Sequence, residues 1–175
     1  VVLGPLGDAG EGVSGVSSGG DIIRLFPASL RILQDFHSGA YGSTRLAAAS
    51  TADTPLATRI AHAALGLLEV APGVTVKDVF LQGWGGNEDV LQIGRQPPLS
   101  ADKAVSHFPR LREVTGVPYS SMLFFDDCNW GNHCARVAQA CPGVVTQRTP
   151  YGMQDSEWKQ GLRKYEQAKL RSIGD

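Results

Sequence analysis

The stretch MLFFDDCNW, residues 122–130, places two adjacent acids at the end of an apolar run. Asp126 and Asp127 repel one another unless a cation lies close to their carboxylates. A hard divalent cation such as Mg²⁺ takes oxygen ligands, usually one or two carboxylates together with water and substrate phosphate. The acid pair therefore predicts a magnesium site. With equal weight, it can be read as a strand that simply ends in polar residues.

Three further residues have side chains that suit phosphate binding. Ser50 and Thr51 follow an apolar run and precede a predicted helix, where free amides and the helix dipole favour an anion. Lys103 precedes a later predicted helix and could neutralise a phosphate as a point charge. The alternatives are ordinary helix capping for the hydroxyl residues and a solvated position for the lysine.

Three cysteines and one histidine lie together in the sequence CNWGNHCARVAQAC. An odd, clustered set of cysteines does not indicate a disulfide framework. Zinc binding through Cys128, His133, Cys134 and Cys141 is a possible reading, but their spacing matches no common structural zinc motif. The sequence favours the other reading, in which free cysteines pack as small hydrophobic side chains.

The elements that must position these residues alternate along the chain. Apolar periodicity, caps and breakers predict helices over residues 27–38, 54–71, 106–115, 133–141 and 155–170, and strands over 44–50, 76–82, 119–125 and 143–147. Such alternation predicts a parallel sheet covered on both faces, a three-layer α/β/α Rossmann-like sandwich. Ligands bind such sheets at the carboxyl ends of the strands, where Asp126 and Asp127 are expected to lie.

Two glycine-rich stretches interrupt this pattern. Residues 1–20 predict a flexible N-terminal segment. Within it, residues 7–20, GDAGEGVSGVSSGG, predict a flexible loop or a disordered linker without a regular element. Residues 82–100 predict an insertion on the surface of the domain that spans residues 21–175. The sequence predicts no large cap domain.

Composition excludes several classes of protein. The formal net charge of −1 over 175 residues offers no basic field for nucleic acid. No apolar run approaches the roughly 20 residues that span a bilayer. The first residues lack a basic leader and the apolar core of a signal peptide, which favours an intracellular protein over a secreted one. The compartment stays unknown.

The order of these motifs resembles that of the haloacid dehalogenase (HAD) superfamily of phosphotransferases. TGVPYSSMLFFDD, with SHFPRLREV before it, is similar to the magnesium-dependent phosphatase family of that superfamily, as are IRLFPASLRILQDF and LAAASTAD. The resemblance implies hydrolysis of phosphomonoesters through an aspartyl-phosphate, with Mg²⁺ as cofactor. It implies that Ser50 and Lys103 act in catalysis, with Thr51 beside them at the phosphate, and that Asp126 and Asp127 hold the metal.

The sequence departs from the family at the nucleophile. The Asp-x-Asp-x-Thr motif occurs nowhere in the 175 residues. Either VVL is the first strand, with Gly4 and Leu6 at the aspartate positions, or the motif lies upstream of Val1. In addition, Ala104 rather than Lys103 occupies the ungapped position of the family's lysine.

These departures leave catalytic activity open. The first hypothesis is a magnesium-dependent phosphatase acting on a phosphorylated small molecule or a phosphoprotein. The alternative is a catalytically inactive HAD-like domain that serves as a structural or interaction subunit of a larger assembly, with other proteins as its partners. The missing nucleophile favours the alternative, because no covalent intermediate forms without it.

Overall fold

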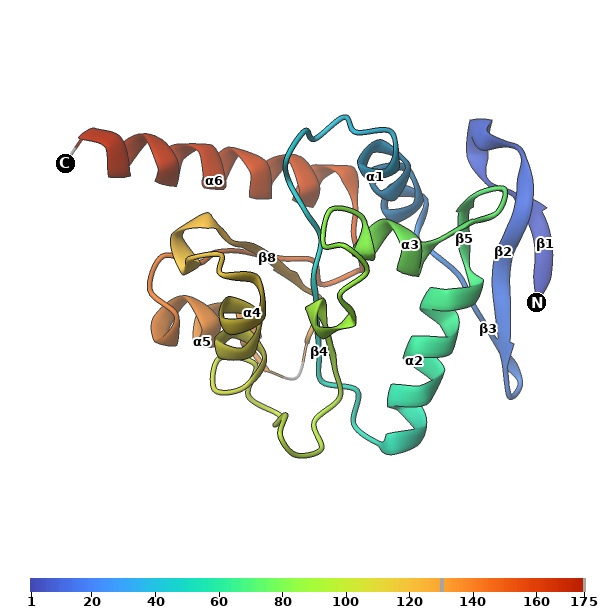
Figure 1. The fold of residues 1–175 in the computed structure, drawn as a ribbon, viewed down its shortest axis with the longest axis horizontal. Coiled ribbons are helices and arrows are strands. Elements are labelled where there is room, and N and C mark those ends of the chain that lie inside the picture. Colours follow the sequence, from blue (N-terminus) through green and yellow to red (C-terminus); the bar gives the residue numbers. More distant parts are fainter. Residues whose placement is uncertain (130, 175) are drawn as a thin grey trace. The chain divides into compact units, whose positions relative to one another are not determined.

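The structure is a computed structural model that describes residues 1–129 and 131–174 (Figure 1). The chain divides into two compact units, Val1–Ala101 and Asp102–Asp175, and each is described by itself. Among the described residues, no helix combines the length and the apolar character that a membrane crossing requires.

The first unit begins with an antiparallel meander of three strands, β1 (Val2–Pro5), β2 (Glu11–Ser18) and β3 (Asp21–Ile23). A single 3₁₀ turn, Gly7–Ala9, separates the first two strands. The prediction that this glycine-rich segment contains no regular element is therefore wrong. Its flexibility as a separate segment stays a prediction.

Contacts with distant residues explain why so many glycines form a strand here. Leu6 is buried in the turn after β1, and the side-chain amide of Gln34 donates hydrogen bonds of 2.8 Å to the carbonyl groups of Leu6 and Val70. Glu69 accepts a 2.9 Å hydrogen bond from the Val13 amide. A Cβ at Gly12 would collide with Glu69 and Leu6, so glycine permits this close approach.

The rest of the first unit is a series of short elements. They are α1 (Pro27–His37), β4 (Ala48–Ser50), α2 (Pro55–Leu67), β5 (Glu69–Ala71), β6 (Val74–Thr75), α3 (Val76–Leu81), a 3₁₀ turn (Glu88–Val90) and β7 (Leu91–Ile93). The prediction of α2 is confirmed at its start, where the Thr54 hydroxyl accepts a 3.0 Å hydrogen bond from the Ala57 amide. The helix ends earlier than predicted, because residues after Leu67 pair as β5 with β6.

Residues 76–81 form the helix α3, so the strand predicted over residues 76–82 is wrong. The reason is a capping box at the start of α3. The Thr75 hydroxyl accepts from the Asp78 amide at 3.1 Å, and the Asp78 carboxylate accepts from the Thr75 amide at 2.8 Å. Two amides at the helix start are thereby satisfied, which favours a helix over a strand despite the β-branched residues.

The predicted surface insertion, residues 82–100, contains a buried strand. β7 pairs in parallel with β4, with Leu91 opposite Ala48 and Ile93 opposite Ser50. Val90, Leu91 and Ile93 form a buried cluster against which Trp84 packs. The prediction of a surface excursion is wrong for β7, because its two apolar residues and Val90 just before it are buried in the core of this unit.

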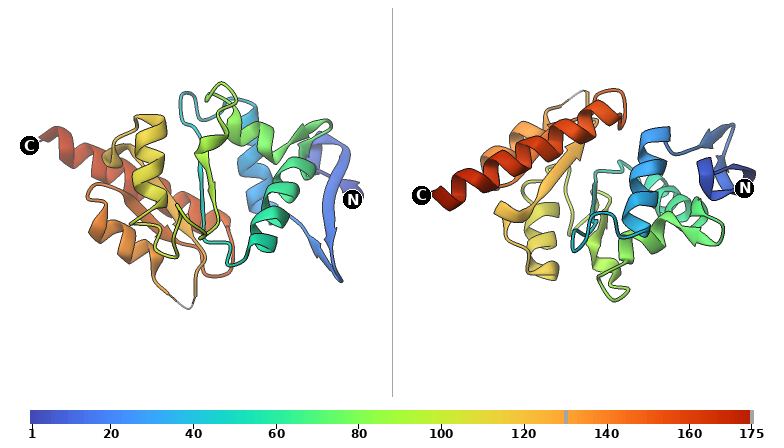
Figure 2. Two further views of the ribbon diagram at one scale, coloured as in Figure 1. Left: turned by 60° about the horizontal axis from the view of Figure 1, so that its bottom comes forward. Right: turned by 90° about the horizontal axis from the view of Figure 1, so that it is seen from above.

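The second unit has helices on both faces of a parallel strand pair. Its elements are α4 (His107–Thr115), a 3₁₀ turn (Tyr119–Ser121), β8 (Leu123–Asp126), α5 (His133–Ala140), β9 (Val145–Arg148) and α6 (Asp155–Gly174) (Figure 2). Phe124 meets Phe108 of α4 edge-on, and the next residue, Phe125, stacks on Trp158 of α6. Successive side chains of a strand point to opposite faces, so α4 and α6 cover opposite faces of β8.

The fold class is mixed α/β, as predicted. Among the named strands that the structure describes, β4 pairs in parallel with β7 and β8 with β9. The strands that the structure describes form four separate small sheets, three of two strands and one of three strands. One continuous parallel sheet, as in the predicted Rossmann-like sandwich, is not among these pairings.

Candidate functional site

The carboxyl end of β8 holds a buried acid, Asp126. Its backbone continues the parallel pairing with β9, opposite Arg148, and its carbonyl accepts a 2.9 Å hydrogen bond from the Thr149 amide. The side chain turns inward and is 5% exposed. A carboxylate buried to this degree requires partners that offset the loss of hydration.

Lys103 is the main partner of this carboxylate. Its ammonium group forms a buried ion pair with Oδ2 of Asp126 and lies 5.2 Å from the ring centroid of Phe124. On the other carboxylate oxygen, Oδ1, the Cys128 amide donates a hydrogen bond of 3.0 Å. The structure therefore brings together two of the residues that the sequence analysis singled out.

The local structure explains how Lys103 reaches the strand end despite the shift of one residue in sequence. Asp102 accepts hydrogen bonds from the Ala104 amide, at 2.9 Å, and from the Arg136 guanidinium, at 2.8 Å. Burial opposes the ionised form of Asp102. The two hydrogen bonds, together with the charge of Arg136 and the Val105 amide, outweigh burial and lower the pKa of the carboxyl group. The turn before α4 thus points Lys103 inward, while Ala104 is buried beside Cys141.

The other predicted site residues are placed differently. Asp127 is exposed, and its part in metal binding stays a prediction. Ser50, the last residue of β4, is half-buried, and its carbonyl accepts a 2.8 Å hydrogen bond from Gly94. Ser50 and Thr51 belong to the first unit, whereas Lys103 and Asp126 belong to the second. Phosphate binding by Ser50 and Thr51 also stays a prediction.

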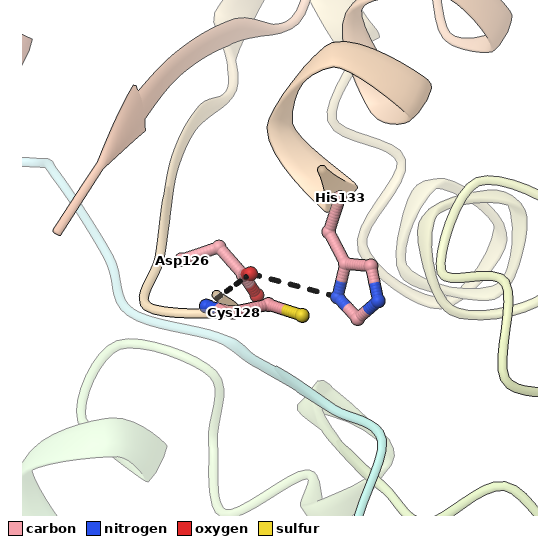
Figure 3. A group of neighbouring side chains, drawn as sticks. All are labelled: Asp126, Cys128 and His133. Carbon is pink, nitrogen blue, oxygen red and sulfur yellow. Dashed lines mark hydrogen bonds and ion pairs between the residues drawn. The ribbon is translucent and has the colours of Figure 1, made fainter. Parts of the chain in front are cut away.

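The structure adds two residues to the strand-end site that the sequence analysis assigned elsewhere. Potential ligand atoms of Asp126, Cys128 and His133 all lie within 4.8 Å of one another (Figure 3). The sequence pattern groups Cys128 and His133 with Cys134 and Cys141, because the cysteines are dense there, and it groups Asp126 with Asp127. The signal that could have found the cluster is an acid at a strand end, a cysteine two positions later, and a histidine that begins the next helix.

Cys134 and Cys141 are buried, in agreement with the prediction that they pack as small hydrophobic residues. Burial, followed by the negative charge of Asp126, raises the pKa of the Cys134 thiol to about 11. Burial also raises the pKa of the Cys141 thiol. Both side chains therefore stay protonated and neutral near pH 7.

The side chains around Asp126 do not form a good magnesium site. Mg²⁺ requires near-octahedral coordination by oxygen atoms. The cluster that the structure describes offers one carboxylate oxygen donor, one sulfur and one imidazole nitrogen, and Lys103 occupies the second oxygen of Asp126. Sulfur and imidazole are the ligands of softer divalent ions.

Lys103 and Asp126 place a fixed ammonium group beside a carboxylate at the carboxyl end of the β8–β9 strand pair. The charge of Lys103 can attract an anion, and Asp126 holds the ammonium group in place. A comparison with protein families concerns the chain as a whole. A family model described as Acid Phosphatase matches residues 4–168, which is most of the chain. No curated protein matched the chain.

Proposed function

Because this chain belongs to the Acid Phosphatase family, the magnesium-dependent phosphatase type within the HAD superfamily, we propose that it has a phosphatase-like function. Its ligands would be phosphomonoesters, recognised at the carboxyl end of β8. The observation that carries this proposal is the buried ion pair of Lys103 and Asp126 at that strand end. A charged pair at this position is costly to bury, so a binding role is a physical reason for it to be there.

Lys103 supplies the charge for an anionic ligand in this proposal. An ammonium group has three N–H donors, and the ion pair with Asp126 uses one of them. Asp126 keeps the ammonium group oriented, so less side-chain entropy is lost when an anion binds. Ser50 and Thr51 would add hydroxyl and amide donors at the phosphate. This requires the three-layer HAD architecture, which is part of the proposal.

Hydrolysis would further require an aspartate nucleophile. The sequence contains no Asp-x-Asp-x-Thr motif. β1 is the first strand of the chain and pairs antiparallel with β2, and Leu6 is a buried apolar residue. Whether Gly4 and Leu6 stand at the aspartate positions, or the motif lies upstream of Val1, stays a prediction. Mg²⁺ would supply charge neutralisation for phosphoryl transfer when bound. Since the described donors around Asp126 do not fit Mg²⁺, no step of this proposal depends on that ion.

The substrate class follows from the family. A phosphorylated small molecule or a phosphoprotein would each present the dianionic group that Lys103 attracts. The choice between them depends on residues outside the phosphate site.

A second candidate function is a catalytically inactive domain that acts as a structural subunit. Two observations favour it: the nucleophile motif is missing from the sequence, and Lys103 already neutralises Asp126. An inactive domain would keep the ion pair for its fold, and it would bind partner proteins of a larger assembly.

Turnover and binding measurements on the whole chain separate the two functions. With p-nitrophenyl phosphate and Mg²⁺, a phosphatase releases nitrophenol, and we expect Asp126→Asn to weaken this activity sharply. Equal activity in the variant would remove Asp126 from the site. The exposed Lys159 on α6 provides a matched control, because Lys159→Met also removes one positive charge.

If turnover is absent, calorimetric titration with inorganic phosphate tests recognition alone. Saturable binding that is lost in Lys103→Met but kept in Lys159→Met supports a phosphate site without hydrolysis. If neither turnover nor binding occurs in the folded protein, the structural-subunit function is the better account.

A further inference from the structure

The cluster at the end of β8 has the composition of a transition-metal site. Asp126 and Cys128 are 7% and 6% exposed, and the His133 side chain is 20% exposed. Their ligand atoms are a carboxylate oxygen, a sulfur and an imidazole nitrogen, all within 4.8 Å of one another (Figure 3). Tetrahedral ligands that lie about 2.0–2.3 Å from a zinc ion are roughly 3.3–3.8 Å apart, so small side-chain rotations would close the site.

One ring nitrogen of His133 indicates that the cluster lacks a bound ligand or ion. Nδ1 of His133 is buried and makes no hydrogen bond to any residue that the structure describes. It lies 3.5 Å from Oδ1 of Asp126. A buried polar atom without a partner costs free energy, so such an atom calls for a ligand or an ion. A metal ion between the ring nitrogen and the carboxylate would satisfy both groups.

Hydrogen bonds hold the backbone around this cluster. The side chain of Asn132 accepts a 2.9 Å hydrogen bond from the Ala135 amide and fixes the start of α5, where His133 is the first residue. Arg148 donates to the Cys128 carbonyl at 3.2 Å, and Asn129 donates to the Pro150 carbonyl at 2.9 Å. The cluster is thus preorganised by its own unit, which favours binding.

We propose that Asp126, Cys128 and His133 bind one divalent transition-metal ion of the zinc class. Carboxylate, thiolate and imidazole are all established zinc ligands, and three protein ligands leave a fourth position open for water. On binding, the Cys128 thiol forms a bond to the ion and loses its proton to solvent. The carboxylate and the thiolate then balance the two positive charges of the ion.

Lys103 opposes this ion. Its ammonium group lies on Oδ2 of Asp126, so it competes for the same carboxylate and repels a cation nearby. Replacing Lys103 by methionine should therefore tighten metal binding, although the same replacement should abolish phosphate recognition. The two proposals share Asp126 but predict opposite effects of one variant, so the failure of one is distinguishable from the failure of the other.

Titration of the whole, reduced, metal-free chain with Co²⁺ tests the site by absorption. We expect one ion per chain, with a thiolate-to-cobalt charge-transfer band in the near ultraviolet, and displacement of the cobalt by Zn²⁺. Loss of a hydrogen-bond partner behind a ligand costs roughly 10–100-fold in metal affinity, so loss of a direct ligand should cost about 100-fold or more. Cys128→Ser and His133→Gln should each show this loss.

Cys134→Ala is the matched control. Cys134 is also buried and is adjacent to His133 in α5, but it lies outside the cluster. We expect the charge-transfer band and the cobalt affinity of the Cys134→Ala variant to equal those of the parent chain. Circular dichroism establishes that each variant is folded, and Cys128→Ala provides a second substitution if Cys128→Ser is not.

Three results would overturn the proposal. One is cobalt binding without the charge-transfer band, and another is affinity unchanged in folded Cys128→Ser or Cys128→Ala. The third is equal loss of affinity in Cys134→Ala, which would place the ion elsewhere.

Discussion

The ion pair of Lys103 and Asp126 leads to a prediction about stability that can be worked out from the structure. The two side chains are 8% and 5% exposed, so water cannot replace either partner easily. Lys103→Met keeps most of the aliphatic volume but leaves Asp126 with the Cys128 amide and the imidazole of His133 as neighbours. Breaking one side of a buried pair costs about 3–5 kcal/mol of unfolding free energy.

This loss is large relative to a typical total stability of about 5–15 kcal/mol. At about 2–4 °C per kcal/mol for a chain of this size, the melting temperature should fall by roughly 6–20 °C. The double variant Lys103→Met/Asp126→Asn removes both charges, and we expect it to regain most of the loss because no buried charge is left uncompensated. Exposed Lys159→Met should change stability by no more than about 0.5 kcal/mol.

The assay is urea unfolding, with a chelator present and circular dichroism as the signal, of five proteins: the parent chain, Lys103→Met, Asp126→Asn, the double variant and Lys159→Met. The first four form a double-mutant cycle. The reasoning is refuted if Lys103→Met is as stable as Lys159→Met. It is also refuted if the effects of the two substitutions simply add in the double variant, because the two side chains would then not interact.

Three further predictions concern other parts of the chain. In an exposed helix, a glycine-to-alanine substitution is stabilising. At Gly161 the added Cβ would lie 2.5 Å from the Phe125 ring, so we expect Gly161→Ala to lower the free energy of unfolding by about 1–3 kcal/mol, measured by thermal unfolding. An increase in stability would contradict the packing of α6 on β8. Thr75→Ala should lower the free energy of unfolding by about 1 kcal/mol, because the cap of α3 is lost. It should also raise the pKa of Asp78, because the hydrogen bond from the Thr75 side chain lowers that pKa. An Asp78 titration by NMR that is the same in the variant and the parent chain would exclude the capping box. The Cys134 thiol ionises near pH 9.0 when unfolded but near pH 11 when folded, so its contribution to the free energy of unfolding should be present below pH 9 and lost as the pH rises toward 11. Denaturant unfolding of Cys134→Ala should lack this part of the pH dependence, and identical profiles for the two proteins would refute it.

The sequence was a good guide where local signals and tertiary packing agree. The helix after Pro27 and the helix that begins at His107 after Ser106 both occur as predicted, since a proline in the first turn and Gly116 at the end are strong local signals. The site residues Lys103 and Asp126 also meet. Their meeting depends on the turn at Asp102, whose hydrogen bond to Arg136 links residues 34 positions apart.

The sequence was a poor guide where distant contacts decide the structure. β2 contains glycine at positions that usually break strands, and long-range contacts with Glu69 and Gln34 order this region. β7 has only three residues within a glycine-rich segment, and its burial comes from pairing with β4. The cluster of Asp126, Cys128 and His133 likewise depends on how the chain turns between β8 and α5, which no local pattern specifies.

The most direct test of the functional site at the end of β8 is a titration of the ¹⁵N-labelled chain with inorganic phosphate, followed by amide NMR. If Lys103 and Asp126 form a phosphate site, the Cys128 amide, which donates to Asp126, should shift in a saturable manner, and this shift should vanish in folded Lys103→Met but persist in Lys159→Met. An unmoved Cys128 amide at saturating phosphate, or an equal shift in Lys103→Met, would contradict the account.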